Sequence, residues 1–158
     1  MSTNKRLAKQ GFTLVEILIV VVILGILAAI VIPQFTNAAE TAKASSLVSQ
    51  LQTMRSQIEL YRIQHNGLYP TLAQMDNTTA DFNNLIIATN VNGAVGTDFG
   101  PYLQKAPTNP FTTNSACRAD NSGDWQFTAA TGKMMAVVPA TVFADRVVLG
   151  IDGEVISQ

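Results

Sequence analysis

The sequence has few of the residues that build catalytic or cross-linked sites. Among its 158 residues there is one cysteine, Cys117, and one histidine, His65. A single cysteine excludes an intramolecular disulfide, and a single histidine excludes a paired-histidine metal site. The chain also lacks a glycine-rich phosphate-binding loop and a basic patch of the kind that binds nucleic acid. These absences give no support for an enzyme, and no nucleic-acid partner is predicted.

The two scarce residues predict structural roles. A catalytic thiol at Cys117 would need His65 beside it, and nothing in the sequence places the two together. We therefore interpret Cys117 as a structural or partly exposed cysteine. His65 follows a helical stretch, so we interpret it as polar surface or as a capping side chain.

Charge is also scarce between Phe12 and Ile32, where Glu16 is the single charged residue. At helical rise this stretch spans about 31 Å, close to the hydrocarbon thickness of a bilayer. The polar leader before it contains no acid but three basic residues, Lys5, Arg6 and Lys9. Basic flanks stay in the cytoplasm, so the sequence predicts a single-pass protein of the inner membrane with its larger part outside.

Two interpretations of this stretch need to be weighed. A secretory signal peptide would be cut near Ala28-Ala29. However, the apolar stretch is longer than a usual signal core, and Gly11 lies before it, where the polar leader ends.

Glu16 is costly in a membrane and therefore marks a functional position. The alternative is that its carboxyl group is protonated, or reaches the headgroups without a partner.

The segment Lys9-Gln10-Gly11-Phe12-Thr13-Leu14-Val15-Glu16 resembles the processing site of type IV pilins and type II secretion pseudopilins. The resemblance implies that a prepilin peptidase cleaves between Gly11 and Phe12 and N-methylates Phe12, while the apolar span is retained. Cleavage would leave 158 − 11 = 147 residues with a net charge of −1 − 3 = −4. The implied partners are further copies of the chain, the membrane and an inner-membrane assembly platform.

The same resemblance implies assembly roles for Glu16, Gly25 and Pro33. After cleavage, the amine of Phe12 lies four residues before Glu16, about 6 Å away along a helix axis. The carboxylate could pair with this amine or, as the resemblance implies, with the amine of a neighbouring subunit. Gly25 permits close backbone approach. Pro33 is expected to kink or locally melt the helix, or to mark the membrane exit.

An amphipathic helix is predicted beyond the membrane, because no proline or glycine occurs from Phe35 to His65. Its apolar residues recur in steps of four and three: Leu47, Leu51, Met54, Ile58 and Tyr61. The opposite face is predicted to carry charged and polar residues, with Arg55 and Glu59 as i,i+4 neighbours. Asn66-Gly67 is a helix stop, so one helix should run from Phe12 to His65.

The remaining residues predict a head domain with several short elements. Thr71 should cap a helix through Met75, and a second helix is predicted over 81–88. Strands 125–127 and 134–138 form one predicted hairpin, and strands 147–151 and 154–156 form another around Asp152-Gly153. The expected fold class is α+β and pilin-like, with a long N-terminal helix packed on a small antiparallel β-sheet. Its parts are a cleaved leader (1–11), a transmembrane helix (12–33), an amphipathic helix (34–66) and a head (67–158).

Two further features bear on the kind of filament. The turn-rich segment from Gly100 to Phe111 resembles the segment that joins helix to sheet in major pseudopilins. Many type IV pilins staple their C-terminal loop with a disulfide, which a single cysteine cannot form. Both features favour a pseudopilin over a pilin that serves adhesion, motility or DNA uptake. An uncleaved membrane protein with a periplasmic binding head is the alternative outside the family.

Calcium is the one cofactor that the sequence suggests. Asp120 and Asp124 place oxygen ligands at alternate positions of a polar turn, which suits Ca²⁺, and major pseudopilins bind calcium in this region. The turn is no EF-hand, because Trp125 stands where glycine is needed and Thr131 stands where a bidentate Glu is needed. A solvated polar turn is the alternative.

Overall fold

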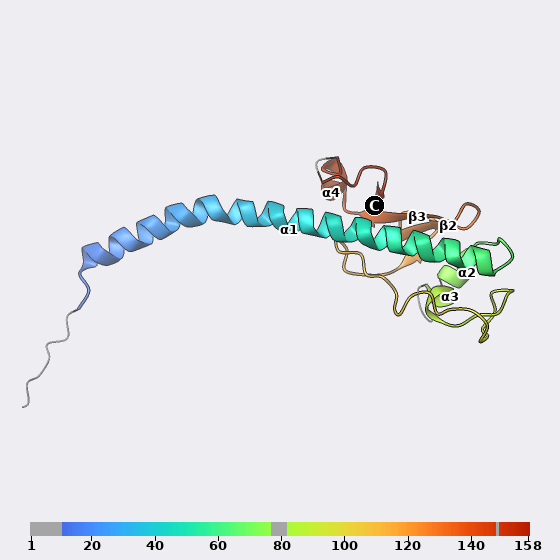
Figure 1. Cartoon of the computed structure of the whole chain (residues 1–158). Helices are drawn as coiled ribbons and strands as arrows, with labels where there is room; N and C mark the ends of the chain where they lie inside the picture. Colours follow the sequence, from blue (N-terminus) through green and yellow to red (C-terminus); the bar gives the residue numbers. More distant parts are fainter. Residues whose placement is uncertain (1–10, 77–81, 148) are drawn as a thin grey trace, which may run out of the picture. The chain divides into compact units, whose positions relative to one another are not determined.

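The computed structural model describes residues 11–76, 82–147 and 149–158 (Figure 1). The predicted basic leader residues Lys5, Arg6 and Lys9 lie outside the described part. The chain divides into two units, Met1–Ala39 and Glu40–Gln158, which are described separately. One helix, α1, runs from Leu14 to Gln64 and contributes to both. The prediction of a single long helix is therefore confirmed, with ends that differ by one or two residues.

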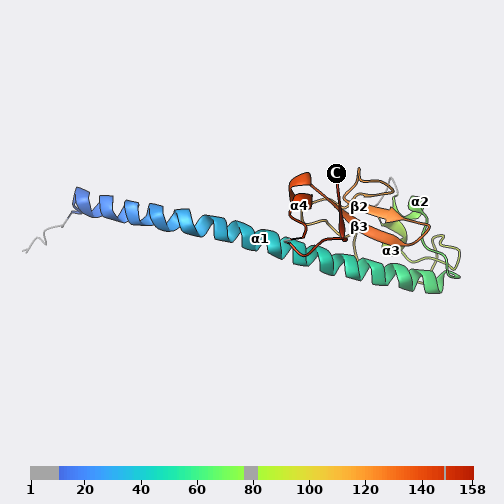
Figure 2. The same cartoon turned by 90° about the horizontal axis from the view of Figure 1, so that it is seen from above.

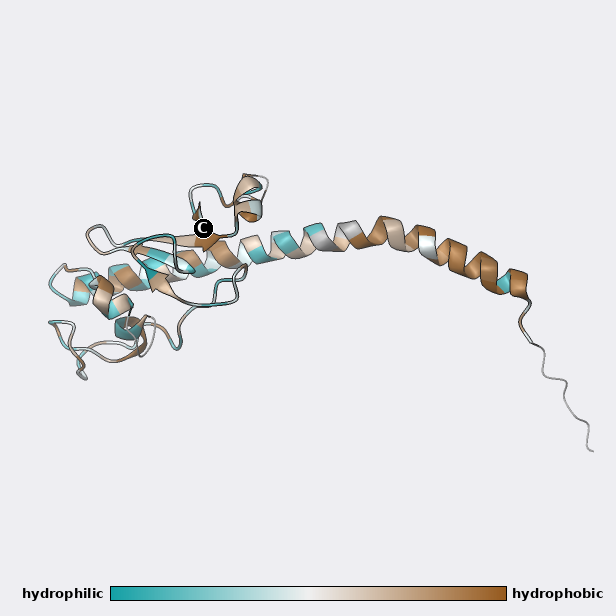
Figure 3. Cartoon of the chain, turned by 180° about the vertical axis from the view of Figure 1, so that it is seen from behind, coloured by the Kyte–Doolittle hydropathy of each residue, from teal (hydrophilic) through white to brown (hydrophobic). Residues whose placement is uncertain are grey.

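The first unit contains the apolar half of α1. All its large apolar side chains between Leu14 and Ile32 are exposed, and hydropathy colouring shows this part of α1 as mostly hydrophobic (Figure 3). Within the described residues, α1 is the one helix that is long and apolar enough to cross a membrane. The helix continues through Pro33, so the predicted local melting there is not found. Proline removes only the hydrogen bond to the carbonyl of Ala29, and the neighbouring turns maintain the helix.

The second unit packs the other half of α1 against a sheet. The predicted stripe is confirmed, since Leu47, Leu51, Met54, Ile58 and Tyr61 are each at most 2% exposed. They share one core with large side chains of the sheet, among them Trp125, Phe127 and Met134. The core therefore depends on one face of the second half of α1. The first half of α1 packs against nothing in the described chain.

The sheet has four strands in the order β1-β2-β3-β4, and Figure 2 shows it lying along α1. The strands are β1 (Cys117–Arg118), β2 (Trp125–Thr128), β3 (Lys133–Val138) and β4 (Val155–Ser157). The predicted β2–β3 hairpin is confirmed as antiparallel. The pairs β1–β2 and β3–β4 are parallel, so the sheet is mixed and its predicted antiparallel form was wrong.

The second predicted hairpin is also wrong. The chain leaves β3 through a short helix, α4 (Ala140–Ala144), and crosses over to bring β4 in parallel to β3. A parallel pair needs such a crossover, and the Asp152-Gly153 turn lies inside it. The amide of Ile151 donates to the carbonyl of Arg146 and that of Glu154 to the carbonyl of Ile151, which are turn contacts.

Short elements close the head at the end of α1. Asn66 takes a left-handed conformation with φ of 55°, and the Gly67 amide donates to the carbonyl of Arg62 at 2.8 Å, which confirms the helix stop. Helix α2 (Leu72–Met75) begins after Thr71, whose amide donates to the side-chain oxygen of Gln74. Helix α3 (Asn83–Ile86) covers part of the predicted range 81–88, and Asp81 lies outside the described residues.

The segment from Gly100 to Phe111 connects the end of α1 with the sheet. The hydroxyl of Tyr102 donates to the side-chain oxygen of Gln64 at 2.6 Å. Asn109 is fully buried, and its amide nitrogen donates to the carbonyls of Asp124 and Val137 at 2.8 and 2.7 Å. A buried side-chain amide with satisfied donors fixes this otherwise irregular chain to β3 and to the residue before β2.

Arg55 joins α1 to the sheet rather than to its neighbour on the helix. Its guanidinium donates twice to the carbonyl of Met134, at 2.7 and 3.2 Å, and pairs with Glu154 at 2.6 Å. Glu59 instead pairs with Arg62 and accepts from the Tyr69 hydroxyl. The predicted opposite face is therefore corrected for Arg55, because a carbonyl and a carboxylate of the sheet lie within its reach.

We expect Arg55→Ala to lower the free energy of unfolding of the head by about 2 kcal/mol, because Met134 and Glu154 lose a charged donor. Denaturant unfolding of the full chain in detergent, followed by Trp125 fluorescence, measures this loss. Lys133→Ala is the control, and as an exposed surface change it should stay within about 0.5 kcal/mol. Equal stability of the two variants would contradict the role given to Arg55.

Candidate processing and assembly segment

The start of α1 carries the residues predicted for processing and assembly. Phe12 lies just before the helix and is 84% exposed. The amide and the hydroxyl of Thr13 each donate to Glu16 Oε2 at 2.8 Å, and the Glu16 amide donates to Thr13 Oγ1 at 3.2 Å. These reciprocal contacts form a capping box, in which two backbone amides at the helix start are satisfied by side chains.

The capping box supplies a local reason for a carboxylate in this position. A negative charge in the first helical turn interacts favourably with the helix dipole, and two donors from Thr13 replace part of its lost hydration. Sequence reasoning interpreted Glu16 as a misplaced charge and overlooked Thr13, although the spacing Thr-x-x-Glu is the signature of this motif. Oxygen Oε1 accepts no hydrogen bond from any residue that the structure describes, so it is available to an external cation.

The other predicted assembly residues lie further along the helix. A Cβ atom added to Gly25 would meet nothing within 4 Å, so this position leaves bare backbone on the helix surface. Ala29 lies one turn later on the same side, and small residues at this spacing allow helices to approach closely. The assembly roles of Glu16, Gly25 and Pro33 stay predictions.

His65 is not polar surface, because it is buried at the end of α1 and 2% exposed, whereas its Nδ1 contact with the carbonyl of Tyr61 agrees with the predicted capping role. Its ring stacks on Tyr61 with centroids 3.6 Å apart. Nδ1 contacts the carbonyl of Tyr61 at 2.8 Å and Nε2 contacts the hydroxyl of Thr89 at 3.0 Å. His65 therefore fastens the loop that contains Thr89 onto the helix. Both ring nitrogens have partners other than Cys117, which lies in the core.

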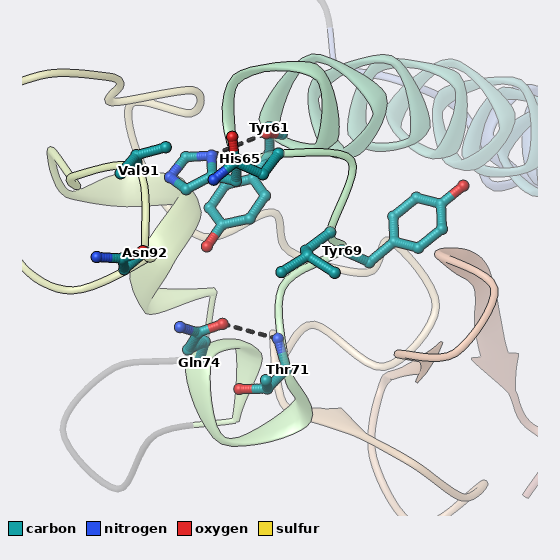
Figure 4. A pocket seen from close by; sticks show the side chains of 9 residues that line it. Tyr61, His65, Tyr69, Thr71, Gln74, Val91 and Asn92 are labelled. Carbon is teal, nitrogen blue, oxygen red and sulfur yellow. Dashed lines mark hydrogen bonds between the residues drawn. The ribbon is translucent and has the colours of Figure 1, made fainter.

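A pocket of about 160 Å³ opens beside this stack (Figure 4). Its lining includes Tyr61, Tyr69, Gln74 and Val91 and contains no carboxylate, lysine or arginine. Burial raises the pKa of the Tyr61 hydroxyl above its ordinary value, so the phenol stays neutral. Pockets for drug-sized ligands usually measure about 300–1,000 Å³, so this one suits a single side chain or a few waters.

The predicted calcium turn uses its carboxylates within the chain. Asp120 Oδ1 accepts from the hydroxyl and the amide of Ser122, which lower the pKa of this carboxyl. Asp124 is 6% exposed, and its Oδ2 accepts from the amide of Ala116 at 2.9 Å. Calcium takes about six to eight oxygen ligands. The described residues contain no group of three or more acidic, histidine or cysteine side chains that could hold a metal. One oxygen of each carboxylate therefore already accepts hydrogen bonds within the chain, and calcium binding at Asp120 and Asp124 stays a prediction.

Comparisons with known proteins match the N-terminal part of the chain. Residues 6–32 match the prokaryotic N-terminal methylation motif. The chain is 41% identical over 66 residues to type II secretion system core protein G of Dickeya chrysanthemi, which is 42% of each chain. It is 39% identical over 70 residues to core protein G of Pseudomonas aeruginosa, or 44% of this chain and 49% of that protein. No solved structure gives a significant match.

The methylation motif, the long apolar helix and the small mixed sheet are consistent with a pilin-like α+β fold. Within this class, the chain is similar to the core protein G of type II secretion systems. The matched part spans less than half the length of these curated relatives.

The capping box makes a prediction about the first helical turn. Thr13→Val keeps the shape of the side chain but removes its hydroxyl, so the Glu16 amide loses its acceptor. We expect this amide to exchange with solvent about fivefold faster, in line with a cap worth about 1 kcal/mol. Hydrogen exchange by NMR on the full chain in detergent measures the rate. Thr13→Ser should exchange like the wild type, and an unchanged rate in the valine variant would contradict the capping box.

Proposed function

We propose that this chain is a structural subunit of a helical pilus-like filament, acting as the major pseudopilin of a type II secretion system. A prepilin peptidase cleaves the membrane-stored chain between Gly11 and Phe12 and methylates the new amine. The observation that carries the proposal is the methylation motif at residues 6–32, which runs directly into an apolar helix that also anchors a head. The names of the similar proteins support type II secretion.

Cleavage and assembly are linked by charge in this proposal. Removing residues 1–11 removes the three leader cations and creates an amine on Phe12. That amine and Glu16 are both costly in lipid, and pairing them between neighbouring copies offsets part of the cost. The contacts between Thr13 and Glu16 Oε2 leave Oε1 for the partner's amine. The pairing favours one axial stagger between copies and therefore sets the register of the filament.

The filament core in this proposal is formed by the apolar half of α1. Its large side chains between Leu14 and Ile32 are at least 41% exposed in the isolated chain. Once the helices leave the bilayer, burying these surfaces against one another is favourable. Gly25 lets backbones approach closely, and Pro33 leaves the Ala29 carbonyl without its usual helical donor. The head, residues 67–158, lies outside the membrane, and an inner-membrane platform adds subunits.

We expect the mature chain to begin at Phe12 and to contain 158 − 11 = 147 residues. Mass spectrometry of the membrane fraction should find this mass with one added methyl group on the N-terminal peptide. An intact leader would instead favour an uncleaved membrane protein with a binding head. A new terminus after Ala29 would indicate a signal peptide, and either result would refute the filament proposal.

Removing the carboxylate of Glu16 tests the register device. We expect Glu16→Leu to be inserted and cleaved normally but to yield about tenfold less sheared filament, since the neighbour's amine loses its counter-ion. The matched control is Glu40→Leu, which makes the same exchange at an exposed site of α1. Immunoblots of sheared and cell-bound fractions measure both steps. Normal filament yield from Glu16→Leu would refute the role of this carboxylate.

A further inference from the structure

The carboxylate of Glu16 has one oxygen engaged and one open. Oε2 accepts from the amide and from the hydroxyl of Thr13, each at 2.8 Å. Oε1 accepts from no residue in the described ranges 11–76, 82–147 and 149–158. An ionised carboxylate offers about four lone-pair sites, so much of its capacity to accept is unused. At the edge of a membrane such an oxygen is costly unless a cation or water reaches it.

The capping box also fixes where this open oxygen lies. Because Oε2 is tied to the amide of Thr13, the carboxylate folds back over the first turn of α1. Residues 11–13 precede the helix, which begins at Leu14, and Phe12 is 84% exposed. The carboxylate therefore lies beside the stretch that joins the leader to the helix, where a cation of the leader can reach it.

The leader supplies cations and no anion. Residues 1–10 contain Lys5, Arg6 and Lys9 and neither Asp nor Glu. The first basic residue after Glu16 is Lys43, which follows 43 − 16 = 27 residues later, beyond the apolar span. Within one chain, the side-chain cations that are near Glu16 in sequence therefore all belong to the leader.

Lys9 is the best placed of these cations. It lies 13 − 9 = 4 residues before Thr13, a stretch that spans at most about 14 Å when extended. A four-residue turn brings its end Cα atoms within about 7 Å, and the flexible lysine stem adds further reach. A Cβ atom added to Gly11, inside this stretch, would meet nothing within 4 Å, and glycine enters turns at little steric cost. Lys5 and Arg6 would have to close longer loops, which costs more entropy.

We propose that, in the uncleaved precursor, the ammonium of Lys9 pairs with Glu16 Oε1 and so masks the carboxylate that the filament uses. This contact rests on the proposed function and specifies how that function is regulated. A cation tethered by so short a stretch has an effective concentration in roughly the millimolar range, so it competes with cations brought by other copies. The occupant is the leader, because its charge is complementary and its last residues adjoin the site.

Cleavage between Gly11 and Phe12 then has two effects at once. It removes Lys9, which uncovers Oε1, and it creates the amine of Phe12 on every copy. Glu16 thereby exchanges a cation of its own chain for a cation of a neighbouring chain. Precursors stored in the membrane are kept from pairing through Glu16, both with one another and with mature copies.

Carbodiimide cross-linking of the full precursor tests this contact. A carbodiimide joins an amine and a carboxylate that touch, with loss of water, and it leaves an acylurea adduct on a carboxylate that has no amine beside it. Membranes from cells without the prepilin peptidase are treated with a membrane-permeant carbodiimide, and the peptides are analysed by mass spectrometry. We expect an amide between Lys9 and Glu16 within single chains.

Two variants with the same change of charge separate Lys9 from the leader as a whole. Lys9→Gln should lose the cross-link and raise the acylurea adduct on Glu16 about fivefold, because the carboxylate is no longer paired. Lys5→Gln should keep both products at the wild-type level. Wild-type Glu16 that carries the adduct without the cross-link would overturn the contact. Equal results for the two variants would do the same, including a Glu16 that reacts in neither.

The experiment also separates this contact from the proposed function. A cross-link that joins two chains, seen as a covalent dimer, would show pairing between precursors and overturn the masking. The expected cross-link in a precursor whose mature form builds no filament would refute the proposed function and leave the contact standing. Normal filaments from a chain whose precursor shows no cross-link would refute the masking alone.

Discussion

The rest of the structure depends on one helix, α1, whose first half is suited to lipid and whose second half is suited to water on one side and to the protein core on the other. Between Leu14 and Ile32, α1 carries one charged residue, Glu16, and its large apolar side chains have no packed face in the described chain. Between Leu47 and Tyr61, only one stripe is buried, and that stripe is the centre of the head's core. A lipid-facing helix and an amphipathic helix need different patterns, and both are present in one unbroken element. The head cannot form its core without the helix that anchors it.

Three arginines of the unit Glu40–Gln158 pair with carboxylates inside that unit. Arg55 pairs with Glu154, Arg118 pairs with Asp76, and Arg146 pairs with Asp152. The partly exposed pairs of Arg118 and Arg146 contribute little to stability, whereas Arg55 also donates to the carbonyl of Met134 and so joins α1 to the sheet. In the proposed filament, assembly depends on the apolar half of α1 and on the proposed charge pair at the N-terminus. This division separates the interactions that fold the head from those that join subunits.

Local features were predictable from the sequence, and long-range pairings were not. The stripe on α1, the stop at Asn66 and the hairpin of β2 and β3 all follow from residues close together in the chain. Strand β4 pairs with β3 across a crossover. The Asp152-Gly153 turn suggested a local hairpin, because a turn sequence does not show which distant strand the following residues pair with. His65 was interpreted as a polar or capping residue at a helix end. Its burial could not be predicted, because its partner Thr89 lies 24 residues away in the sequence. The capping box at Thr13 was local and was missed because the membrane cost of Glu16 dominated the interpretation.

The capping box also changes how the cost of Glu16 is understood. A carboxylate with no donors in lipid would need a partner at all times, and storage in the membrane would be unfavourable. Thr13 provides two donors to Oε2, so the precursor can wait in the bilayer with part of this cost offset. In the proposed mechanism the remaining oxygen pairs with the Phe12 amine of a neighbouring copy, and that amine would exist only after cleavage at Gly11. On this proposal, the same carboxylate is tolerated before processing and most favourable after it, and assembly would be tied to the mature chain.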